Sequence, residues 1–490
     1  MSSGLADSST RVGAGRDDRP LASRRFVVTG LGVAGYSAAT ALLMRGAEVT
    51  VIDSAAEPVH ADRVGVLELL GAQVHLGAGP ECPPGDVLVV STGIPMSHSW
   101  ISTAAHRGMP VWGEFELAWR LRPAENPAAW LYVTGTNGKT TTTLMLESIL
   151  RADGLRAKAV GNIGDSLIDA VVSDDPYDVL AVEVGAPHLP YLYSVSPEAT
   201  VCLNVAPDHV DYFGSYDAYV QAKATAYERT RSACIYNVDD PVTEQMVRDA
   251  DVIEGARAVG FTLGVPAPGM LGVVDDLLVD RAFTPARYSH AQELAAMSDI
   301  VPPAPHQVAN ALAAAALARA HGVSPEAVSV GLRTFTPARH RIAGVGTVAG
   351  VSYVDDSKAT NWHAALTSLR AYEPVVWIAG GQAKGQDFDT LVKETSPRMR
   401  AVVLLGVDRD VIRESLARHA PDLPVVEVAR TDTGAMDEVV RVAAQWAQPG
   451  DTVLLAPGCA SRDMYVDYAE RGDEFAAAVA RLRASHVLAD

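Results

Sequence analysis

The stretch that decides the fold is LYVTGTNGKTTTT, at residues 131–143. Its apolar first part predicts a strand, the two glycines predict a loop, and the residues after Lys139 predict a helix. Glycines let backbone N–H groups turn toward phosphate oxygens, and the N-terminus of the helix adds its dipole. Lys139 is expected to reach the β- and γ-phosphates, and the Thr140 hydroxyl to bind Mg²⁺. The predicted ATP-binding residues of this loop are Gly135, Thr136, Asn137, Gly138, Lys139, Thr140 and Thr141.

The spacing differs from the standard Walker A loop, which would place a glycine where Val133 stands. The alternative interpretation is a glycine-rich turn between a strand and a helix, followed by a surface lysine. The agreement of strand, loop, Lys-Thr pair and helix favours ATP binding.

Short apolar strands alternate with helical stretches on both sides of this loop. Strands are expected at 25–29, 48–52, 87–91, 130–134, 179–184, 199–205, 375–379, 401–405, 425–428 and 452–455. This alternation predicts an α/β fold with parallel sheets that are covered on both faces. A chain of 490 residues is too long for one hydrophobic core. We therefore predict a disordered tail at 1–24 and three domains, at 25–124, 125–336 and 337–490.

The chain is acidic, with 59 Asp and Glu against 40 Lys and Arg and a net charge of -19. An acidic field disfavours binding to nucleic acid and to anionic membranes. No run of about 18 apolar residues occurs, so no membrane span is expected, and the polar first 24 residues do not resemble a secretory signal. The four cysteines lie far apart without a CxxC pair, which suits a reducing compartment. We expect a cytoplasmic monomer.

The string GTNGKT resembles the ATP loop of the Mur ligases and of their relatives, the folylpolyglutamate synthetases. The resemblance continues in four segments: Glu183 at the end of VLAVEV, LNVAPDHVD at 203–211, YVQAK at 219–223 and HQVANAL at 306–312. It implies catalytic roles for Lys139, Glu183, His209 and Lys223, metal binding by Thr140, Glu183, His209 and Lys223, and adenine contact by Asn310. In this family the lysine at the position of Lys223 is carbamylated, which would give it a carboxylate-like end.

The resemblance also implies a reaction, the joining of a carboxylate to an amine. Such a reaction needs a leaving group, and ATP supplies one by forming an acyl phosphate. The negative charges that gather in the pocket call for two Mg²⁺ ions. The implied architecture is a Rossmann-like N-terminal domain, a central P-loop ATPase-like domain and a Rossmann-like C-terminal domain.

The last third of the chain indicates which member it resembles. VDDSKATN at 354–361 is typical of the D-glutamate-adding ligases, whose substrates are UDP-N-acetylmuramoyl-L-alanine and D-glutamate. GGQAKG at 380–385 and PGCAS at 457–461 match further segments of that subfamily. The resemblance implies ATP contacts for Arg341, Asp356 and Lys358. It implies a glutamate pocket of Thr360, Lys384, Ser461 and Tyr468, where Tyr468 replaces the usual phenylalanine.

The N-terminal block contains GLGVAG at 30–35, followed by Asp53 at the end of the next predicted strand. Alone, this pattern suggests a dinucleotide site and hence an NAD(P)-dependent oxidoreductase. The other interpretation is that the glycines are required only by a tight turn. The resemblance implies a UDP site instead. Its residues would be Gly32, Val33, Ala34, Asp53, Thr92, Gly93 and, in the GNIG element at 161–164, Asn162.

One segment departs from the family pattern. After Glu183 the family has LSSFQL, whereas this chain has VGAPHL at 184–189. Pro187 is expected to alter the backbone at the start of a helix, and His188 either replaces a lost polar contact or is a surface or structurally satisfied histidine. The departure leaves open a paralogue that uses L-glutamate or another acceptor, or a regulatory protein that has lost the chemistry.

Overall fold

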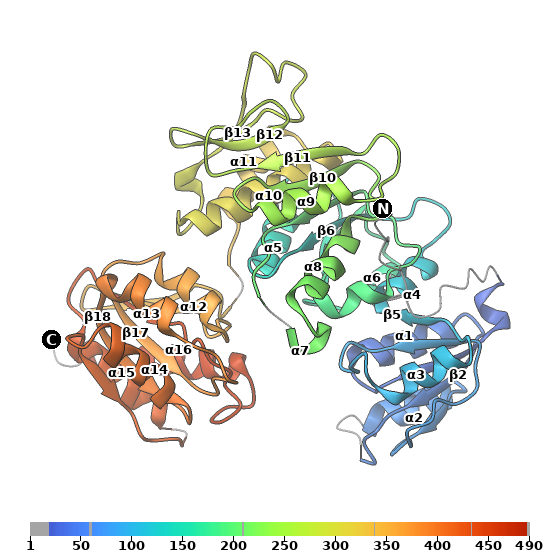
Figure 1. The fold of residues 1–490 in the computed structure, drawn as a ribbon, viewed down its shortest axis with the longest axis horizontal. Helices are drawn as coiled ribbons and strands as arrows, with labels where there is room; N and C mark the ends of the chain where they lie inside the picture. The colour runs from blue at the N-terminus through green and yellow to red at the C-terminus, as the bar shows by residue number, and fades with distance from the viewer. Residues whose placement is uncertain (1–18, 58–60, 208–209, 338, 433, 488–490) are drawn as a thin grey trace, which may run out of the picture. The chain divides into compact units, whose positions relative to one another are not determined.

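A computed structural model describes residues 19–487, except 58–60, 208–209, 338 and 433. Three mainly parallel sheets with helices beside them form the fold (Figure 1), which confirms the predicted α/β class with three domains. The chain also divides into two compact units, Met1–Pro303 with Gln307–Phe335 and Ala304–His306 with Thr336–Asp490. The first unit contains two of the sheets and the second contains the third. The residue bounds predicted for the three domains stay a prediction.

The N-terminal domain has a five-stranded parallel sheet of order β3-β2-β1-β4-β5. Its elements are η1 (Leu21–Ser23), β1 (Arg25–Thr29), α1 (Val33–Leu43), β2 (Glu48–Ile52), α2 (Ala61–Leu69), β3 (Gln73–His75), β4 (Val87–Val90), α3 (Ser99–His106), β5 (Val111–Gly113) and α4 (Glu114–Leu121). The order of strands reverses between β1 and β4. In open α/β sheets such a reversal opens a crevice beyond the carboxyl ends of the strands, where ligands bind.

The central domain has a nine-stranded sheet of order β14-β13-β12-β11-β10-β9-β6-β8-β7. Its strands are β6 (Ala129–Thr134), β7 (Ala157–Gly161), β8 (Val179–Glu183), β9 (Ala199–Cys202), β10 (Ala233–Asn237), β11 (Arg257–Phe261), β12 (Met270–Val274), β13 (Leu277–Asp280) and β14 (Gln292–Ala296). Only the pairs β12·β13 and β13·β14 are antiparallel. Strand β6 lies between β8 and β9, so the loop that follows β6 opens at the reversal point of this sheet.

Helices of the central domain cover both faces of the apolar strands. They are α5 (Lys139–Ala152), α6 (Leu167–Val171), η2 (Ala186–Tyr191), α7 (Val210–Phe213), α8 (Tyr216–Ala224), η3 (Thr225–Tyr227), α9 (Pro241–Asp249), η4 (Met297–Asp299), α10 (Pro305–His321) and α11 (Pro325–Thr334). The alanine-rich helix α10 is buried over most of its length. Small side chains allow such a helix to pack closely, which explains its composition.

The C-terminal domain has a six-stranded sheet of order β15-β16-β20-β17-β18-β19, in which only β15 is antiparallel to its neighbour. Its elements are β15 (Ala343–Val348), β16 (Val351–Asp355), α12 (Trp362–Leu369), β17 (Val375–Gly380), α13 (Asp389–Thr395), η5 (Ser396–Arg398), β18 (Met399–Leu405), α14 (Arg409–His419), β19 (Val425–Glu427), α15 (Ala435–Trp446), β20 (Thr452–Leu455) and α16 (Tyr468–Val487). Strands β16, β20 and β17 are adjacent and parallel, so the loops that follow them emerge at one edge.

Two buried glutamates at the start of α4 join the first two domains within the first unit. The Glu116 carboxylate accepts hydrogen bonds from the backbone N–H groups of Tyr193 and Ser194, both at 2.9 Å. Glu114 accepts from the Ser166 hydroxyl and the Leu167 N–H, both at 3.1 Å. Burial raises the pKa of Glu114. These bonds satisfy carboxylates that would otherwise be costly to bury.

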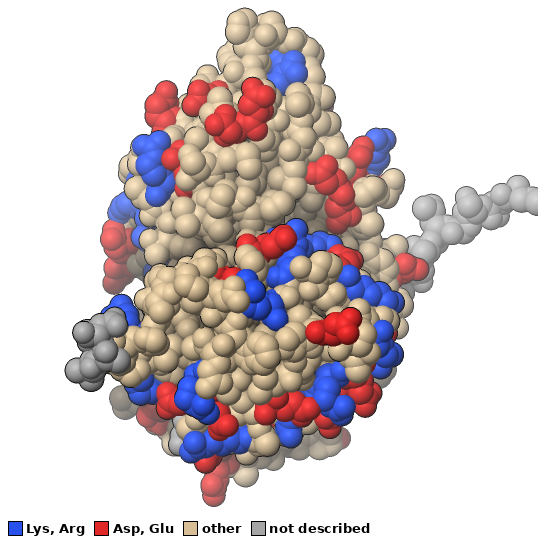
Figure 2. All heavy atoms as spheres, turned by 90° about the vertical axis from the view of Figure 1, so that its left-hand side faces the viewer, with Lys and Arg blue, Asp and Glu red and all other residues tan. Residues whose placement is uncertain are grey.

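No helix among the described residues is long and apolar enough to cross a membrane. On the face shown in Figure 2, basic and acidic side chains are interspersed rather than gathered by sign. Arg481 and Asp437 form one exposed ion pair, with Nε and Oδ1 2.7 Å apart.

Candidate active site

The phosphate loop joins β6 to α5 in a conformation that requires its glycines. Gly135 and Gly138 have φ values of +147° and +84°, which side chains other than glycine rarely adopt. A Cβ atom on Gly138 would also collide with the carboxamide of Asn310. The Lys139 ammonium bends back to the carbonyls of Gly135 (2.9 Å) and Thr136 (2.8 Å). The loop is therefore a concave turn at the start of a helix, with a lysine folded over it.

Glu183 at the end of β8 lies directly beside this loop. Its carboxylate is 2 % exposed and accepts hydrogen bonds from the Thr140 hydroxyl at 2.6 Å and from the Asn162 amide at 3.0 Å. Strands β6 and β8 are parallel neighbours, which brings a residue just after one and a residue at the end of the other together. The structure thus assembles Thr140, Glu183 and Asn162 from three segments that the sequence analysis had selected separately.

Hydroxyl and carboxylate oxygens are the hard donors that Mg²⁺ prefers, usually together with phosphate and water. Thr140 and Glu183 fit that requirement. Among the described residues there is no group of three or more His, Cys, Asp or Glu side chains that could hold a metal alone. Asp208 and the predicted ligand His209 lie outside the described residues.

Lys223 on α8 is buried, with 1 % of its surface exposed. Its ammonium donates to the Gly135 carbonyl at 2.9 Å and lies 4.9 Å from the centroid of the Tyr219 ring. The Tyr219 hydroxyl is 3.0 Å from the hydroxyl of Thr136. Lys223 is therefore part of the phosphate-loop surroundings and not a solvated surface lysine.

The segment that departs from the family pattern forms the 3-10 helix η2. Pro187 occupies its second position, where a missing N–H removes no helical hydrogen bond. Gly185 leaves room for Asn162, because a Cβ there would lie 3.0 Å from the Asn162 carboxamide. Next to this 3-10 helix, Asn162 donates a hydrogen bond to Glu183; an altered backbone at Pro187 relative to the family stays a prediction.

His188 is not a surface residue, as it is 3 % exposed. Its ring packs against Phe115 with centroids 4.1 Å apart, and burial lowers its pKa to about 3. The imidazole is therefore neutral at physiological pH. It lines a pocket within the first unit together with Ser91, Thr92, Ile94, Glu114, Tyr191 and Tyr212.

The glycine turn of the N-terminal domain lies at the reversal between β1 and β4. Gly30 has a φ of +79°, and a Cβ on Gly35 would collide with the Gly30 carbonyl. These two glycines are thus required by the turn itself, whereas Gly32 has open space around it. The Asp53 carboxylate accepts from the Leu31 N–H at 2.9 Å and so ties β2 to the turn. Val33 beside it is 58 % exposed.

In the C-terminal domain, most of the predicted ATP and glutamate residues come from the loops after β16, β17 and β20, whereas Arg341 precedes β15 and Tyr468 begins α16. The Lys358 ammonium lies 3.7 Å from the centroid of the Tyr468 ring, a cation–π contact that phenylalanine would also allow. Asp356 accepts a hydrogen bond from the Ser368 hydroxyl, and burial raises the pKa of Asp356 to about 7, which the nearby Arg341 partly counters.

The loop after β17 and the loop after β20 are hydrogen-bonded to each other. Gln382 and Ala460 exchange backbone hydrogen bonds of 2.8 and 3.0 Å, which brings the turn of Lys384 beside the turn of Ser461. Lys384 is exposed and Ser461 is buried. Thr360 is half-buried in the turn that follows Lys358. The structure thus assembles the predicted pocket residues at one edge of the sheet, but their roles stay predictions.

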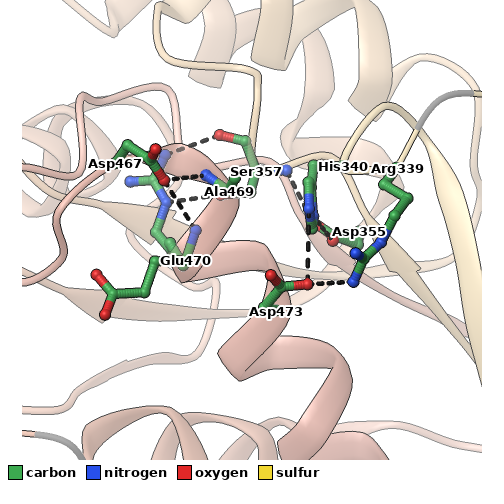
Figure 3. Close-up of polar contacts among 9 residues, drawn as sticks. Arg339, His340, Asp355, Ser357, Asp467, Ala469, Glu470 and Asp473 are labelled. Carbon is green, nitrogen blue, oxygen red and sulfur yellow. Dashed lines mark hydrogen bonds and ion pairs between the residues drawn. The ribbon is translucent and has the colours of Figure 1, made fainter. Parts of the chain in front are cut away.

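Sequence reasoning missed several polar contacts around these loops, some buried and some exposed. His340 Nδ1 and Asp355 Oδ2 are 2.7 Å apart, and Arg339 and Asp473 form an ion pair beside them (Figure 3). In the central domain, Asn204 exchanges hydrogen bonds of 2.9 and 3.1 Å with the backbone of Asn137. Asn204 lies inside the quoted segment LNVAPDHVD, which was the available signal for it, and His340 immediately precedes the predicted Arg341. Asp355 is one residue before the predicted Asp356.

Comparison with known proteins agrees with this arrangement. Three family models match: a MurD-like N-terminal domain at 24–113, the Mur ligase middle domain at 133–318, and the Mur ligase glutamate ligase domain at 340–459. The UDP-N-acetylmuramoylalanine--D-glutamate ligase of Streptomyces coelicolor is 55% identical over 464 residues, 94% of this chain and 98% of that protein. The protein of the same name from Mycolicibacterium smegmatis is 42% identical over 490 residues, 93% of this chain and 96% of that protein.

Solved structures show the same fold at low sequence identity. UDP-N-acetylmuramate-alanine ligase MurC of Thermotoga maritima has a TM-score of 0.56 and 18% identity over 94% of this chain and all of that one. A pseudomurein peptide ligase of Methanothermus fervidus has a TM-score of 0.57 and 16% identity, with the same coverage.

The fold and the phosphate loop define a three-domain α/β enzyme that uses a nucleoside triphosphate. The relatives that match over nearly the full length identify the family. The chain belongs to the Mur ligase family. The alternative of an NAD(P)-dependent oxidoreductase is left without support.

Proposed function

We propose that this chain joins the carboxylate of UDP-N-acetylmuramoyl-L-alanine to the amine of D-glutamate at the expense of ATP. The observation that carries the proposal is the identity of 55% over nearly the whole chain with a relative named for that reaction. The arrangement of Lys139, Thr140, Glu183 and Lys223 around one glycine loop supports it, because these are the groups that such chemistry needs.

The proposed reaction has two steps. A carboxylate oxygen of the UDP precursor attacks the γ-phosphorus of ATP, the bond to the bridging oxygen breaks, and ADP leaves. The nitrogen of D-glutamate then attacks the acyl carbon, and the tetrahedral intermediate collapses with loss of inorganic phosphate and of the amine proton. The loop N–H groups and Lys139 orient and neutralise the phosphates.

Thr140 and Glu183 would hold one Mg²⁺, whose bound charge offsets the negative charge of the phosphates. His209 and Lys223 are proposed for a second Mg²⁺, with Lys223 carbamylated. The buried position of Lys223 supports the modification, because a carbamate turns a buried cation into an oxygen ligand next to the loop. Outside the phosphate loop, the residues proposed to contact ATP are Asn310, Arg341, Asp356 and Lys358.

The UDP precursor is proposed to bind at the N-terminal domain through Gly32, Val33, Ala34, Asp53, Thr92, Gly93 and Asn162. Thr92 and the neutral His188 line one pocket within the first unit, which supports a contact with the precursor near Thr92. D-Glutamate is proposed to bind Thr360, Lys384, Ser461 and Tyr468. We further propose that the protein works as a cytoplasmic monomer and binds no nucleic acid.

The test is phosphate release from ATP and Mg²⁺ in the presence of UDP-N-acetylmuramoyl-L-alanine, with D-glutamate, L-glutamate or no amino acid. We expect release that depends on D-glutamate and that Lys139→Met abolishes. Release with L-glutamate alone would keep the ligase chemistry and overturn the specificity. No release with either amino acid, while ATP still binds, would contradict the proposal.

A further inference from the structure

A buried arginine near the start of α16 plays no part in the function proposed above. Arg471 is 1 % exposed. Within the described part of the chain, no carboxylate lies within ion-pair distance of its guanidinium. Burial lowers the pKa of Arg471 to about 10, so the side chain still carries its charge at neutral pH. Asp463 and Asp355 favour that charge from beyond ion-pair distance, but a cation buried this deeply is costly unless its N–H groups are satisfied.

The N–H groups of Arg471 are satisfied by three loops of the C-terminal domain. Nε donates to the Ser357 hydroxyl at 2.9 Å and Nη2 to the Ser357 carbonyl at 2.8 Å. Nη1 donates to the Cys459 carbonyl at 3.1 Å and makes a long contact of 3.5 Å with the Gly380 carbonyl. These acceptors follow or end β16, β20 and β17, the three adjacent strands whose loops carry the predicted pocket.

The position of Arg471 is fixed by the start of its helix. The Asp467 carboxylate accepts from the N–H groups of Ala469 (2.8 Å) and Glu470 (2.9 Å), and Figure 3 shows this cap beside Ser357. Next along the helix, Gly472 has no side chain, and a Cβ there would collide with His340 and Asp355. The first turns of α16 are therefore packed directly against the loops.

Each acceptor of Arg471 stands close in sequence to a predicted ligand of the amino acid. Ser357 is three residues before Thr360, Gly380 begins the turn of Lys384, and Cys459 is two residues before Ser461. A planar guanidinium can satisfy three such acceptors at fixed spacing, which the single ammonium of a lysine cannot.

We propose that Arg471 is a positioning residue for the amino-acid substrate, which sets the spacing of the three loops and adds a buried positive charge beside an anionic ligand. The proposal rests on the proposed function for the identity of that ligand. A displacement of the loops by about 1 Å can cost on the order of 100-fold in rate or apparent affinity. The effect should therefore appear in the KM for D-glutamate.

The experiment compares Arg471→Met and Arg471→Lys with Arg481→Met, which removes an exposed arginine further along the same helix. We expect Arg471→Met to raise the KM for D-glutamate on the order of 100-fold. Arg471→Lys should give a smaller rise, and the KM for UDP-N-acetylmuramoyl-L-alanine should not change. Arg481→Met should match the wild type. An unchanged KM for D-glutamate, or an equal rise in both KM values, would overturn the proposal.

A second measurement does not depend on the substrate. Hydrogen exchange of backbone amides at 356–361, 380–385 and 457–462 should be faster in Arg471→Lys than in the wild type, while exchange in α15 stays the same. Arg471→Lys decides the question if Arg471→Met does not fold. If the wild type releases no phosphate with D-glutamate, the proposed function fails, whereas unchanged exchange in these loops refutes the positioning role itself.

Discussion

The replacement Glu183→Gln should separate the charge of this residue from its hydrogen bonds. Glu183 accepts from Thr140 at 2.6 Å and from Asn162 at 3.0 Å, one bond to each oxygen. In the variant, the amide oxygen can still accept from Asn162. The amide N–H₂ can donate to the Thr140 hydroxyl, which rotates to accept. Both bonds survive the change of residue, and only the negative charge is lost.

The expected effects on stability and on activity therefore differ widely. The weaker neutral bonds cost roughly 1 kcal/mol each, which the lower desolvation cost of an amide offsets. A net change within about 1 kcal/mol moves the Tm by about 2–4 °C. Loss of one charge at the site where the phosphates and Mg²⁺ meet should lower kcat by about 10²–10³-fold, the effect of removing one preorganised electrostatic group.

The control is Glu183→Ala, which deprives both Thr140 and Asn162 of their acceptor. The buried Thr140 hydroxyl loses this hydrogen bond, which costs about 1–3 kcal/mol, whereas the exposed Asn162 amide can donate to water instead. This variant should therefore unfold at a lower temperature than the wild type. Calorimetry and phosphate release at saturating Mg²⁺ measure the two effects. A Glu183→Gln enzyme that keeps more than a tenth of the wild-type kcat would refute the role of the charge. Equal losses of Tm in both variants would refute the exchange of hydrogen bonds.

Three more predictions concern other buried polar groups. Lys223→Ala should abolish phosphate release, and short carboxylates such as formate should restore part of it; full activity without them would remove Lys223 from the mechanism. His188→Gln should keep the KM for the UDP precursor near that of the wild type. His188→Phe should raise this KM about tenfold, which corresponds to the loss of one hydrogen bond. The KM for ATP should not change in either variant. Because burial raises the pKa of Asp356 to about 7, the folded chain holds a proton between about pH 4 and 7 that the unfolded chain has released. The free energy of unfolding should fall as pH rises through this range, and urea titrations at pH 5 and pH 8 should show a smaller difference in Asp356→Asn.

The parts of the site that the sequence predicted are those that follow strands directly. The glycine loop after β6 and Glu183 at the end of β8 needed only the rule that the ends of parallel strands meet at one edge. The positions of such residues can be predicted from the sequence because they depend on local chain geometry and on the type of sheet.

The contacts that the sequence did not reveal are made between residues far apart in the chain. Arg471 and Ser357 are 114 residues apart, and no periodicity marks one arginine of α16 as buried. His188 posed the same problem, because a single histidine after a strand is compatible with surface, core or pocket. Its environment depends on Phe115, which belongs to another domain. Burial of a lone polar residue is set by tertiary packing, and a local pattern does not contain it.

The departure at 184–189 can now be placed relative to the chemistry. Glu183 keeps both of its partners, and Gly185 supplies the space that the Asn162 amide needs to reach it. The changed residues Pro187 and His188 face the pocket lined by Thr92 instead. Substitution in this segment therefore affects the side proposed to bind the UDP precursor and leaves the groups around the phosphate loop intact. In a protein that had lost the ligase reaction, the groups around the phosphate loop would be expected to change as well. The altered segment therefore argues for a change in how the UDP precursor is bound and against a loss of the reaction.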